Sequence, residues 1–331
     1  MILILLATYR GERFLEPLLD SLRRQTYDDW QLLVRDDGSH DRTPSIVRDA
    51  AAADRRIVPV VDDSPRLGSA GNFARLMQHA TLVDAEAYAF ADQDDVWRPD
   101  KLDRQLRAMR ELVDRHGAHH PALVHTDLEV VDEHLRTVHA SFASFARVHR
   151  DVDDPFRSLL VANHVTGCTM LFNRELLRRA LPMPAEARMH DWWTALCAAA
   201  WGRLRYLPEP TVRYRQHGEN VVGAERPWRR YNPLAAGFSA RWRAGLRDWR
   251  RTIAQMQALR LHLHAAEEPP PESVLRRIDE FCRAVEDPAG PWTRWHRLRR
   301  AGFAEASLLR QALLAARLWT SPPCATRDSA A

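Results

Sequence analysis

The sequence predicts an α/β protein in which a mostly parallel sheet carries helices on both faces and is followed by a helical region. From the start to about residue 115, short apolar runs alternate with helical patterns, an order typical of a parallel sheet. After about residue 225 the apolar residues recur at steps of three and four, the spacing of amphipathic helices. A chain of 331 residues is long enough for one large domain and a smaller appendage.

In the first part, four apolar runs predict strands, at residues 2–6, 32–34, 57–61 and 87–91. Helical patterns follow them at 13–24, from Thr43, from about Gly68, and at 99–115. Thr43 is expected to cap its helix, with Pro44 at the first helical position. The run 2–6 is short and has no basic leader, so we interpret it as a buried strand and not as a signal peptide.

The middle of the chain mixes both patterns, with strands expected at 123–125, 128–130, 166–172 and 211–214 and a helix at 191–201. An apolar stripe from Phe238 to Leu263 predicts a long amphipathic helix, and two further helices are expected at about 272–286 and 294–319. The expected organisation is a sheet domain over 1–223, a helical region over 224–320 and a disordered tail over 321–331.

Composition excludes several classes of protein. The net charge is only +4, and the basic side is almost all arginine, so the pI of about 9.1 does not indicate nucleic-acid binding. The four cysteines form no CxxC pair, which argues against a zinc or disulfide framework and fits a reducing cytoplasm. No stretch approaches the roughly 18 apolar residues needed to span a bilayer.

Three carboxylates, Asp92, Asp94 and Asp95, stand within four residues directly after an apolar strand. Their mutual repulsion is unfavourable unless a cation or solvent relieves it. Hard oxygen ligands suit Mg²⁺ or Mn²⁺, which can bridge to phosphate oxygens. A solvated acidic loop that begins a helix explains the same residues, and the spacing alone leaves both interpretations open.

Two further acidic positions follow predicted strands or precede helices. Asp36 ends the second strand, where a carboxylate can accept hydrogen bonds from a nucleobase or ribose, although a simple turn also uses aspartate. Asp191 precedes Trp192 and Trp193, which can desolvate it and tune it as a general base. It could instead be an N-cap, and His190 is a less favoured base.

His217 lies in a polar, glycine-containing loop, where a histidine can ligate a metal or contact a diphosphate, although a lone histidine often does neither.

The order of these motifs resembles the family 2 glycosyltransferases of the GT-A fold, a Rossmann-like sheet, over roughly residues 1–223. The matching pieces are Ala7-Thr8-Tyr9-Arg10-Gly11, Asp36-Asp37-Gly38-Ser39, Gly68 through Phe73, Phe90 through Trp97, Asn163 through Thr169, His190-Asp191-Trp192-Trp193 and Tyr214-Arg215-Gln216-His217. The DQDDVW, HDWW and YRQHG elements look most like bacterial rhamnosyltransferases of surface polysaccharide synthesis. Residues 1–223 would then be the nucleotide-sugar-binding and catalytic domain.

The resemblance implies roles for the nucleotide side of the site. Thr8 and Tyr9 would hold the nucleotide, and Asp36 would read the base. Asp92 and Asp94 would form the Asp-x-Asp motif, with Asp92 facing the ribose or the metal and Asp94 the metal on the diphosphate.

It also implies roles on the sugar side. Asp95 would line the donor sugar, Gly167 would belong to the acceptor loop, and His217 would complete metal binding. Asp191 matches the catalytic base, although the family more often has Glu-Asp than His-Asp there. The Gln-x-x-Arg-Trp motif of processive synthases is missing, which argues for single-sugar transfer.

The implied reaction is an inverting transfer from a dTDP- or UDP-sugar, best dTDP-L-rhamnose, to a glycan or lipid-linked glycan, with Mg²⁺ or Mn²⁺. The protein would act in the cytoplasm, and the C-terminal helices could rest on the inner face of an anionic membrane, cap the domain or dimerise. A nucleotidylyltransferase would normally show a glycine-rich, lysine-containing loop where this chain has Ala7-Thr8-Tyr9-Arg10-Gly11. A non-catalytic glycan-binding assembly subunit is the other alternative, against which the intact acidic set argues.

Overall fold

The computed structural model describes residues 1–62, 64–146, 154–217, 238–303 and 308–320. Its contacts divide the chain into two units. The sheet unit comprises Met1–Val148, Val165–Ala185 and Met189–Arg226, and the helical unit comprises His149–His164, Glu186–Arg188 and Pro227–Ala331. The helical unit therefore takes two short segments from the part that the sequence assigns to the first domain. The predicted tail lies outside the described residues.

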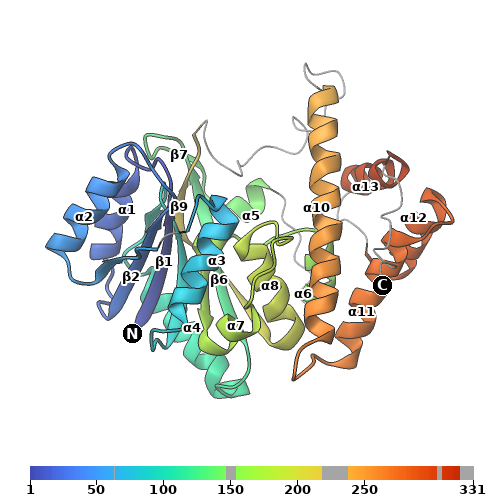
Figure 1. Cartoon of the computed structure of the whole chain (residues 1–331), viewed down its shortest axis with the longest axis horizontal. Helices are drawn as coiled ribbons and strands as arrows, with labels where there is room; N and C mark the ends of the chain where they lie inside the picture. The colour runs from blue at the N-terminus through green and yellow to red at the C-terminus, as the bar shows by residue number, and fades with distance from the viewer. Residues whose placement is uncertain (63, 147–153, 218–237, 304–307, 321–331) are drawn as a thin grey trace. The chain divides into compact units, whose positions relative to one another are not determined.

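Within the described residues, nine strands form one mixed sheet in the order β3-β2-β1-β4-β8-β6-β9-β5, with β7 paired to β6 (Figure 1). Their bounds are β1 Ile2–Thr8, β2 Trp30–Asp36, β3 Ile57–Pro59, β4 Ala87–Asp92, β5 Val96–Trp97, β6 Ala122–Val131, β7 Thr137–His139, β8 Met170–Asn173 and β9 Arg203–Arg215. Strands β3, β2, β1 and β4 run parallel, whereas β8 is antiparallel to both β4 and β6. The predicted α/β class is confirmed.

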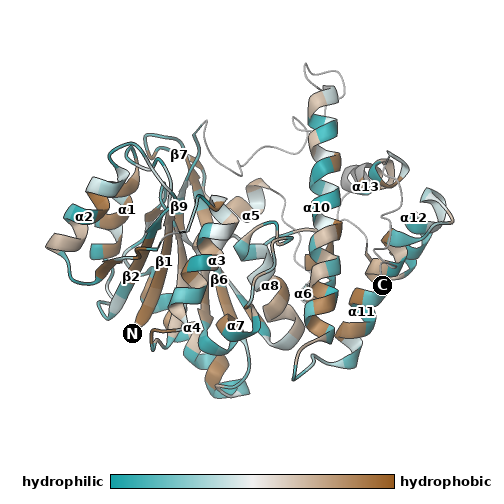
Figure 2. Ribbon diagram, in the orientation of Figure 1, coloured by the Kyte–Doolittle hydropathy of each residue, from teal (hydrophilic) through white to brown (hydrophobic). Residues whose placement is uncertain are grey.

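Helices cover both faces of the sheet because its central strands are apolar on both sides (Figure 2). The helices are α1 Leu15–Arg23, α2 Thr43–Ala53, α3 Gly68–Ala80, α4 Lys101–His116, α5 Phe142–Phe145, α7 Arg174–Arg179 and α8 His190–Trp201. Ile4 and Leu6 of β1 join one core with α1, α2 and α4. On the other face, Phe73 of α3 meets Phe90 of β4 at a ring-centroid distance of 5.4 Å.

Several predicted boundaries are wrong. Thr43 is the first residue of α2 and does not cap it, since the N-cap is Arg42. Only the second half of the strand predicted at 166–172 exists, because Gly167–Thr169 forms a 3₁₀ turn. The runs 123–125 and 128–130 belong to the single strand β6, whose register against β9 shifts around Asp127.

The helical unit contains α6 Pro155–Val161, α10 Phe238–His264, α11 Glu272–Glu286, α12 Pro291–Arg300 and α13 Leu308–Thr320. The helix predicted at 294–319 is therefore two helices. The apolar stripe of α10 is buried at Ile253, Met256, Leu259 and Leu263, and α11 packs against α10. This second half of the stripe therefore belongs to a core of the helical unit. No helix among the described residues is both long and apolar enough to cross a bilayer.

Candidate active site

The sheet register brings the predicted nucleotide-binding residues to one edge. Thr8 at the end of β1 is level with Asp36 of β2, and Ala7 is level with Asp92 of β4. The carboxyl edge of a parallel sheet is where α/β proteins bind their ligands. The positions that the sequence singled out on three separate strands therefore lie side by side.

Asp36 is held in place by three hydrogen bonds. Its Oδ1 accepts from Thr8 Oγ1 at 2.9 Å and from Ser39 Oγ at 2.6 Å, and its Oδ2 accepts from the Ser39 backbone N–H at 2.7 Å. Gly38 makes the turn possible with a φ of +83°. A carboxylate fixed in this way retains lone pairs for a ligand in a defined direction.

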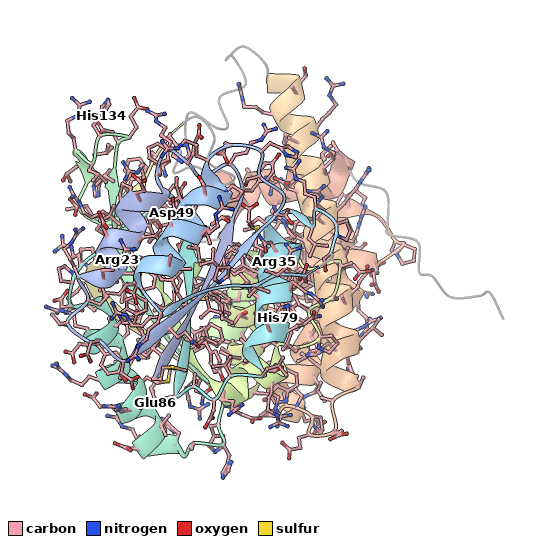
Figure 3. All side chains as sticks on the ribbon, turned by 60° about the vertical axis from the view of Figure 1, so that its left-hand side comes forward. Arg23, Arg35, Asp49, His79, Glu86 and His134 are labelled. Atoms are coloured by element: carbon pink, nitrogen blue, oxygen red, sulfur yellow. The ribbon has the colours of Figure 1, made fainter. Side chains whose placement is uncertain are left out.

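Behind this turn, Arg35 of β2 forms a buried ion-pair cluster. It bonds Asp37 at 2.9 Å and Asp62 at 3.2 Å. Arg75 and His79 of α3 also approach Asp62, at 2.9 and 3.6 Å, and Figure 3 labels Arg35 and His79. These contacts hold the pKa of Asp62 well below its usual range, first through its hydrogen bond with Arg35. The cluster ties the Asp36 turn to α3.

Gln93 joins the loop after β1 to the acidic loop, a contact that no local sequence pattern indicates. Its Oε1 accepts from the Tyr9 N–H at 2.9 Å, and its Nε2 donates to the Tyr9 carbonyl at 3.0 Å. A Cβ at Gly11 would lie 2.5 Å from Gln93 Oε1, so a larger residue there would displace the Gln93 amide. The guanidinium of Arg66 lies 3.9 Å from the centroid of the Tyr9 ring, a cation–π contact at the same edge.

The acidic loop contains two kinds of carboxylate. Asp94 lies 2.7 Å from His217, measured from Oδ2 to Nε2. Asp95 is fully buried, and its Oδ1 accepts from the Arg215 backbone N–H at 3.2 Å. Asp92, Asp95 and Cys168 each present a potential ligand atom, all within 4.8 Å of one another. The donor-sugar role of Asp95 stays a prediction.

Strand β9 ends two residues before His217 and places this histidine beside the acidic loop. Its last residue, Arg215, donates from Nε to the Asp94 carbonyl at 2.8 Å. Phe14 packs against both residues, with 4.8 Å between its ring centroid and that of His217 and 4.5 Å from its centroid to the Arg215 guanidinium. These contacts span more than 120 residues of sequence, so no local pattern shows them.

Asp191 occupies the start of α8 but does not cap it. The N-cap is Met189, which makes the N-cap interpretation of Asp191 wrong. Its Oδ2 accepts from the Gly167 N–H at 3.1 Å, and its Oδ1 accepts from the Trp192 N–H at 2.5 Å. The negative charge of Asp191 also contributes to the electrostatics of Asp92. The predicted base and the acidic loop therefore share one site.

His190 has a packing role. It is 2% exposed, stacks on Phe73 with 3.6 Å between ring centroids and meets the edge of Phe90 at 4.5 Å. Neither ring nitrogen has a hydrogen-bond partner among the described residues. Burial lowers the pKa of His190 to about 3. A Cβ at Gly167 would lie 2.9 Å from its Nε2, so the 167–169 turn is tightly packed on this ring.

The residues present fit a divalent cation. Burial, followed by the charges of Asp94 and Asp191, raises the pKa of Asp92 to about 7. A cation would relieve the repulsion that contributes to this shift. Carboxylate oxygens with one imidazole, as Asp92, Asp94 and His217 supply, suit Mg²⁺ or Mn²⁺.

Solved structures share this fold, which is that of the GT-A glycosyltransferases. Staphylococcus aureus TarS 1-349 in complex with UDP-GlcNAc aligns with a TM-score of 0.54 at 15% identity, covering 96% of this chain and 79% of that one. The mannosyltransferase PcManGT from Pyrobaculum calidifontis, in complex with GDP-Man and Mn²⁺, aligns with a TM-score of 0.50 at 20% identity, covering 95% and 78%.

Residues 3–181 match the family model described as Glycosyl transferase family 2, and the chain belongs to this family. It is 26% identical to an uncharacterized glycosyltransferase of Nostoc sp. over 66% of this chain and 65% of that protein, which is less than two thirds of its length. It is also 26% identical to the dTDP-rhamnosyl transferase RfbG of Shigella flexneri, over 66% of this chain and 74% of that one. The predicted family and fold are confirmed.

Proposed function

We propose that this protein is an inverting, metal-dependent glycosyltransferase that transfers L-rhamnose from dTDP-L-rhamnose to a glycan or lipid-linked glycan in bacterial surface polysaccharide synthesis. The reaction class is supported by two observations: Asp94 lies 2.7 Å from His217, and the charges of Asp94 and Asp191 both act on Asp92. The choice of rhamnose is supported by the similarity to RfbG and by the DQDDVW, HDWW and YRQHG elements.

In this mechanism the chain's residues hold the donor and accept a proton. Thr8, Tyr9 and Asp36 bind the nucleoside. Mg²⁺ or Mn²⁺ held by Asp92, Asp94 and His217 would offset the charge that develops on the leaving nucleoside diphosphate. Asp191 accepts the proton of the attacking acceptor hydroxyl. A single displacement inverts the anomeric centre, so no covalent glycosyl-enzyme forms.

A donor screen with purified protein, Mn²⁺ or Mg²⁺ and a panel of dTDP-, UDP- and GDP-sugars tests the proposal through nucleoside-diphosphate release. We expect dTDP-L-rhamnose to be preferred. Preference for a UDP-sugar would overturn the sugar but not the reaction class. Release of pyrophosphate from a nucleotide and a sugar phosphate would indicate a nucleotidylyltransferase, and binding without turnover an assembly subunit.

The catalytic base is tested separately with Asp191→Asn, which keeps the shape and hydrogen-bonding reach of the side chain. We expect a loss of about 10²–10⁴-fold in kcat, since this is the usual contribution of a general base. Nucleotide affinity should be retained. A folded variant that binds nucleotide and transfers sugar at a near-normal rate would falsify the assignment.

We also propose that the protein works at the cytoplasmic face of a membrane and that α12 and α13 contact anionic lipid. Trp292 and Trp319 are 62% and 44% exposed, and their rings meet at 4.9 Å. Arg299 and Arg300 are exposed on α12, which has no acidic residue. Exposed tryptophan beside arginine is the chemistry of peripheral membrane binding.

Flotation with phosphatidylglycerol vesicles at low salt tests this surface. We expect binding that a Trp292→Ala, Trp319→Ala double variant loses, and none to phosphatidylcholine. Leu261→Ala is the matched control, because Leu261 is 67% exposed on α10 of the same unit. Equal binding by the double variant, or no binding by the wild-type protein, would contradict the proposal.

A further inference from the structure

A buried polar pair on α4 lies behind the 167–169 turn. Lys101 and Gln105 are both 0% exposed, and they stand one helical turn apart on the same face of α4. Lys101 Nζ donates to Gln105 Oε1 at 2.6 Å, and Gln105 Nε2 donates to the Thr169 carbonyl at 2.6 Å. A buried amide and a buried amino group are costly unless they are hydrogen-bonded, so this chain of contacts requires an explanation.

The chemistry of its two ends fixes the orientation of the Gln105 amide. A backbone carbonyl can only accept, so Thr169 must face the amide nitrogen. The amide oxygen is then the atom that accepts from Lys101 Nζ. Lys101 is itself held over the ring of Trp97, 4.0 Å from the centroid. The amide therefore has one orientation that satisfies both neighbours.

Thr169 belongs to the turn that holds Asp191. The turn closes through the Thr169 N–H, which donates to the Thr166 carbonyl at 3.0 Å. Two residues before Thr169, the Gly167 N–H donates to Asp191 Oδ2. The turn cannot shift toward α8 without meeting His190, since even one added carbon at Gly167 would lie 2.9 Å from that ring. Gln105 therefore holds the Thr169 carbonyl of the same turn whose Gly167 N–H bonds the Asp191 carboxylate.

We propose that Gln105, locked by Lys101, is a positioning residue that sets the carboxylate of Asp191 for proton transfer. This inference rests on the proposed role of Asp191 as the base. It assigns a function to Lys101, the single lysine among the 48 lysine and arginine residues of the chain. An arginine would place a larger, planar group against Trp97 and could not present the same point donor to the amide.

Gln105→Glu removes one of the two hydrogen bonds of the Gln105 side chain, the one to the Thr169 carbonyl. A glutamate still accepts from Lys101, but when ionised it cannot donate to the Thr169 carbonyl. We expect kcat to fall about 10–100-fold, the scale of a misplaced reacting group, while the donor KM and the nucleotide affinity stay within about two-fold. Gln255→Glu is the matched control, because Gln255 is also 0% exposed and accepts from the Arg188 N–H within the helical unit. It should leave kcat unchanged.

A double-mutant cycle separates positioning from a general structural effect. If Gln105 acts through Asp191, Gln105→Glu should cost nothing further in kcat when added to Asp191→Asn. Losses that multiply, no loss in Gln105→Glu alone, or an equal loss of nucleotide affinity would overturn the proposal. Near-normal activity of Asp191→Asn would instead refute the proposed function. Should Gln105→Glu not fold, Lys101→Met, which frees the amide to rotate, carries the same cycle with the same expected outcomes.

Discussion

The most quantitative consequence of the structure concerns acid stability, and it depends on His190. Its imidazole is buried between Phe73 and Phe90 without a hydrogen-bond partner among the described residues. Burial lowers its pKa from the ordinary 6.5 to about 3. In the folded state it therefore remains neutral at pH values at which the unfolded chain takes up a proton.

The sign follows from proton binding. Between pH 6.5 and 3 the unfolded state holds more protons at this position than the folded state, so the free energy of unfolding decreases as the pH falls. Between pH 7 and pH 5 the pKa difference corresponds to a loss of about 2 kcal/mol, since each pH unit below 6.5 contributes about 1.4 kcal/mol. Replacing His190 with leucine removes this titration. It also removes the aromatic stacking, which costs about 0.5–1.5 kcal/mol at every pH.

Urea unfolding of the wild-type protein and His190→Leu at pH 7 and pH 5 measures the difference. We expect the variant to lose about 2 kcal/mol less than the wild type between the two pH values. His134→Leu controls for the removal of an imidazole, because His134 lies on the surface of the sheet unit (Figure 3). Equal losses in His190→Leu and the wild type would show that the buried ring does not resist protonation.

Three further predictions address the metal, the turn and the core of the site. Asp94→Asn should weaken Mn²⁺-dependent nucleotide binding at least about tenfold in calorimetry, because a charged oxygen ligand is lost, while affinity after chelation stays the same. Gly167→Ala should lower both the melting temperature and kcat, because its Cβ would meet His190, with nucleotide affinity retained. Arg35→Leu should lower the free energy of unfolding in urea by about 3–5 kcal/mol, because the buried Asp37 and Asp62 both lose the guanidinium that they contact. Arg75 is half-exposed, so a smaller loss in Arg35→Leu than in Arg75→Leu would contradict the role of Arg35.

The location of the site could be predicted because it depends on local patterns. Continuous apolar runs identify β1, β2 and β4 as strands buried on both faces. Once these strands are parallel, Thr8, Asp36 and Asp92 must lie at one edge. The pairing of Asp94 with His217 could not be derived from local pattern, and came from the resemblance to the family. The structure brings these two side chains to 2.7 Å.

The supporting contacts could not be predicted, because each joins side chains far apart in sequence. In the sequence Gln93 only separates two aspartates, yet its side chain bonds the Tyr9 backbone across 84 residues. Gln105 reads as one polar position of an amphipathic helix, yet it bonds Thr169 across 64 residues. The 3₁₀ turn at Gly167 was hidden within an apolar run. The one sequence feature that indicates such a contact is Lys101, because a single lysine in an arginine-rich chain suggests a position at which arginine is not used.

The geometry of the metal-binding side depends on the short strand β5. Val96 and Trp97 of β5 pair with Arg213 and Val212 of β9, and the same stretch of β9 pairs with Leu128 and neighbouring residues of β6. Because side chains alternate along a strand, a shift of one residue in this pairing would reverse the sides on which Tyr214 and Arg215 lie. Arg215 could then no longer bond the Asp94 carbonyl, and His217 would move away from the Asp94 side chain. The buried Asp95, which accepts from the Arg215 N–H, opposes such a shift, since its carboxylate would lose this hydrogen bond. Asp95 therefore supports the site through the register of β9, independently of any contact that it makes with the donor sugar.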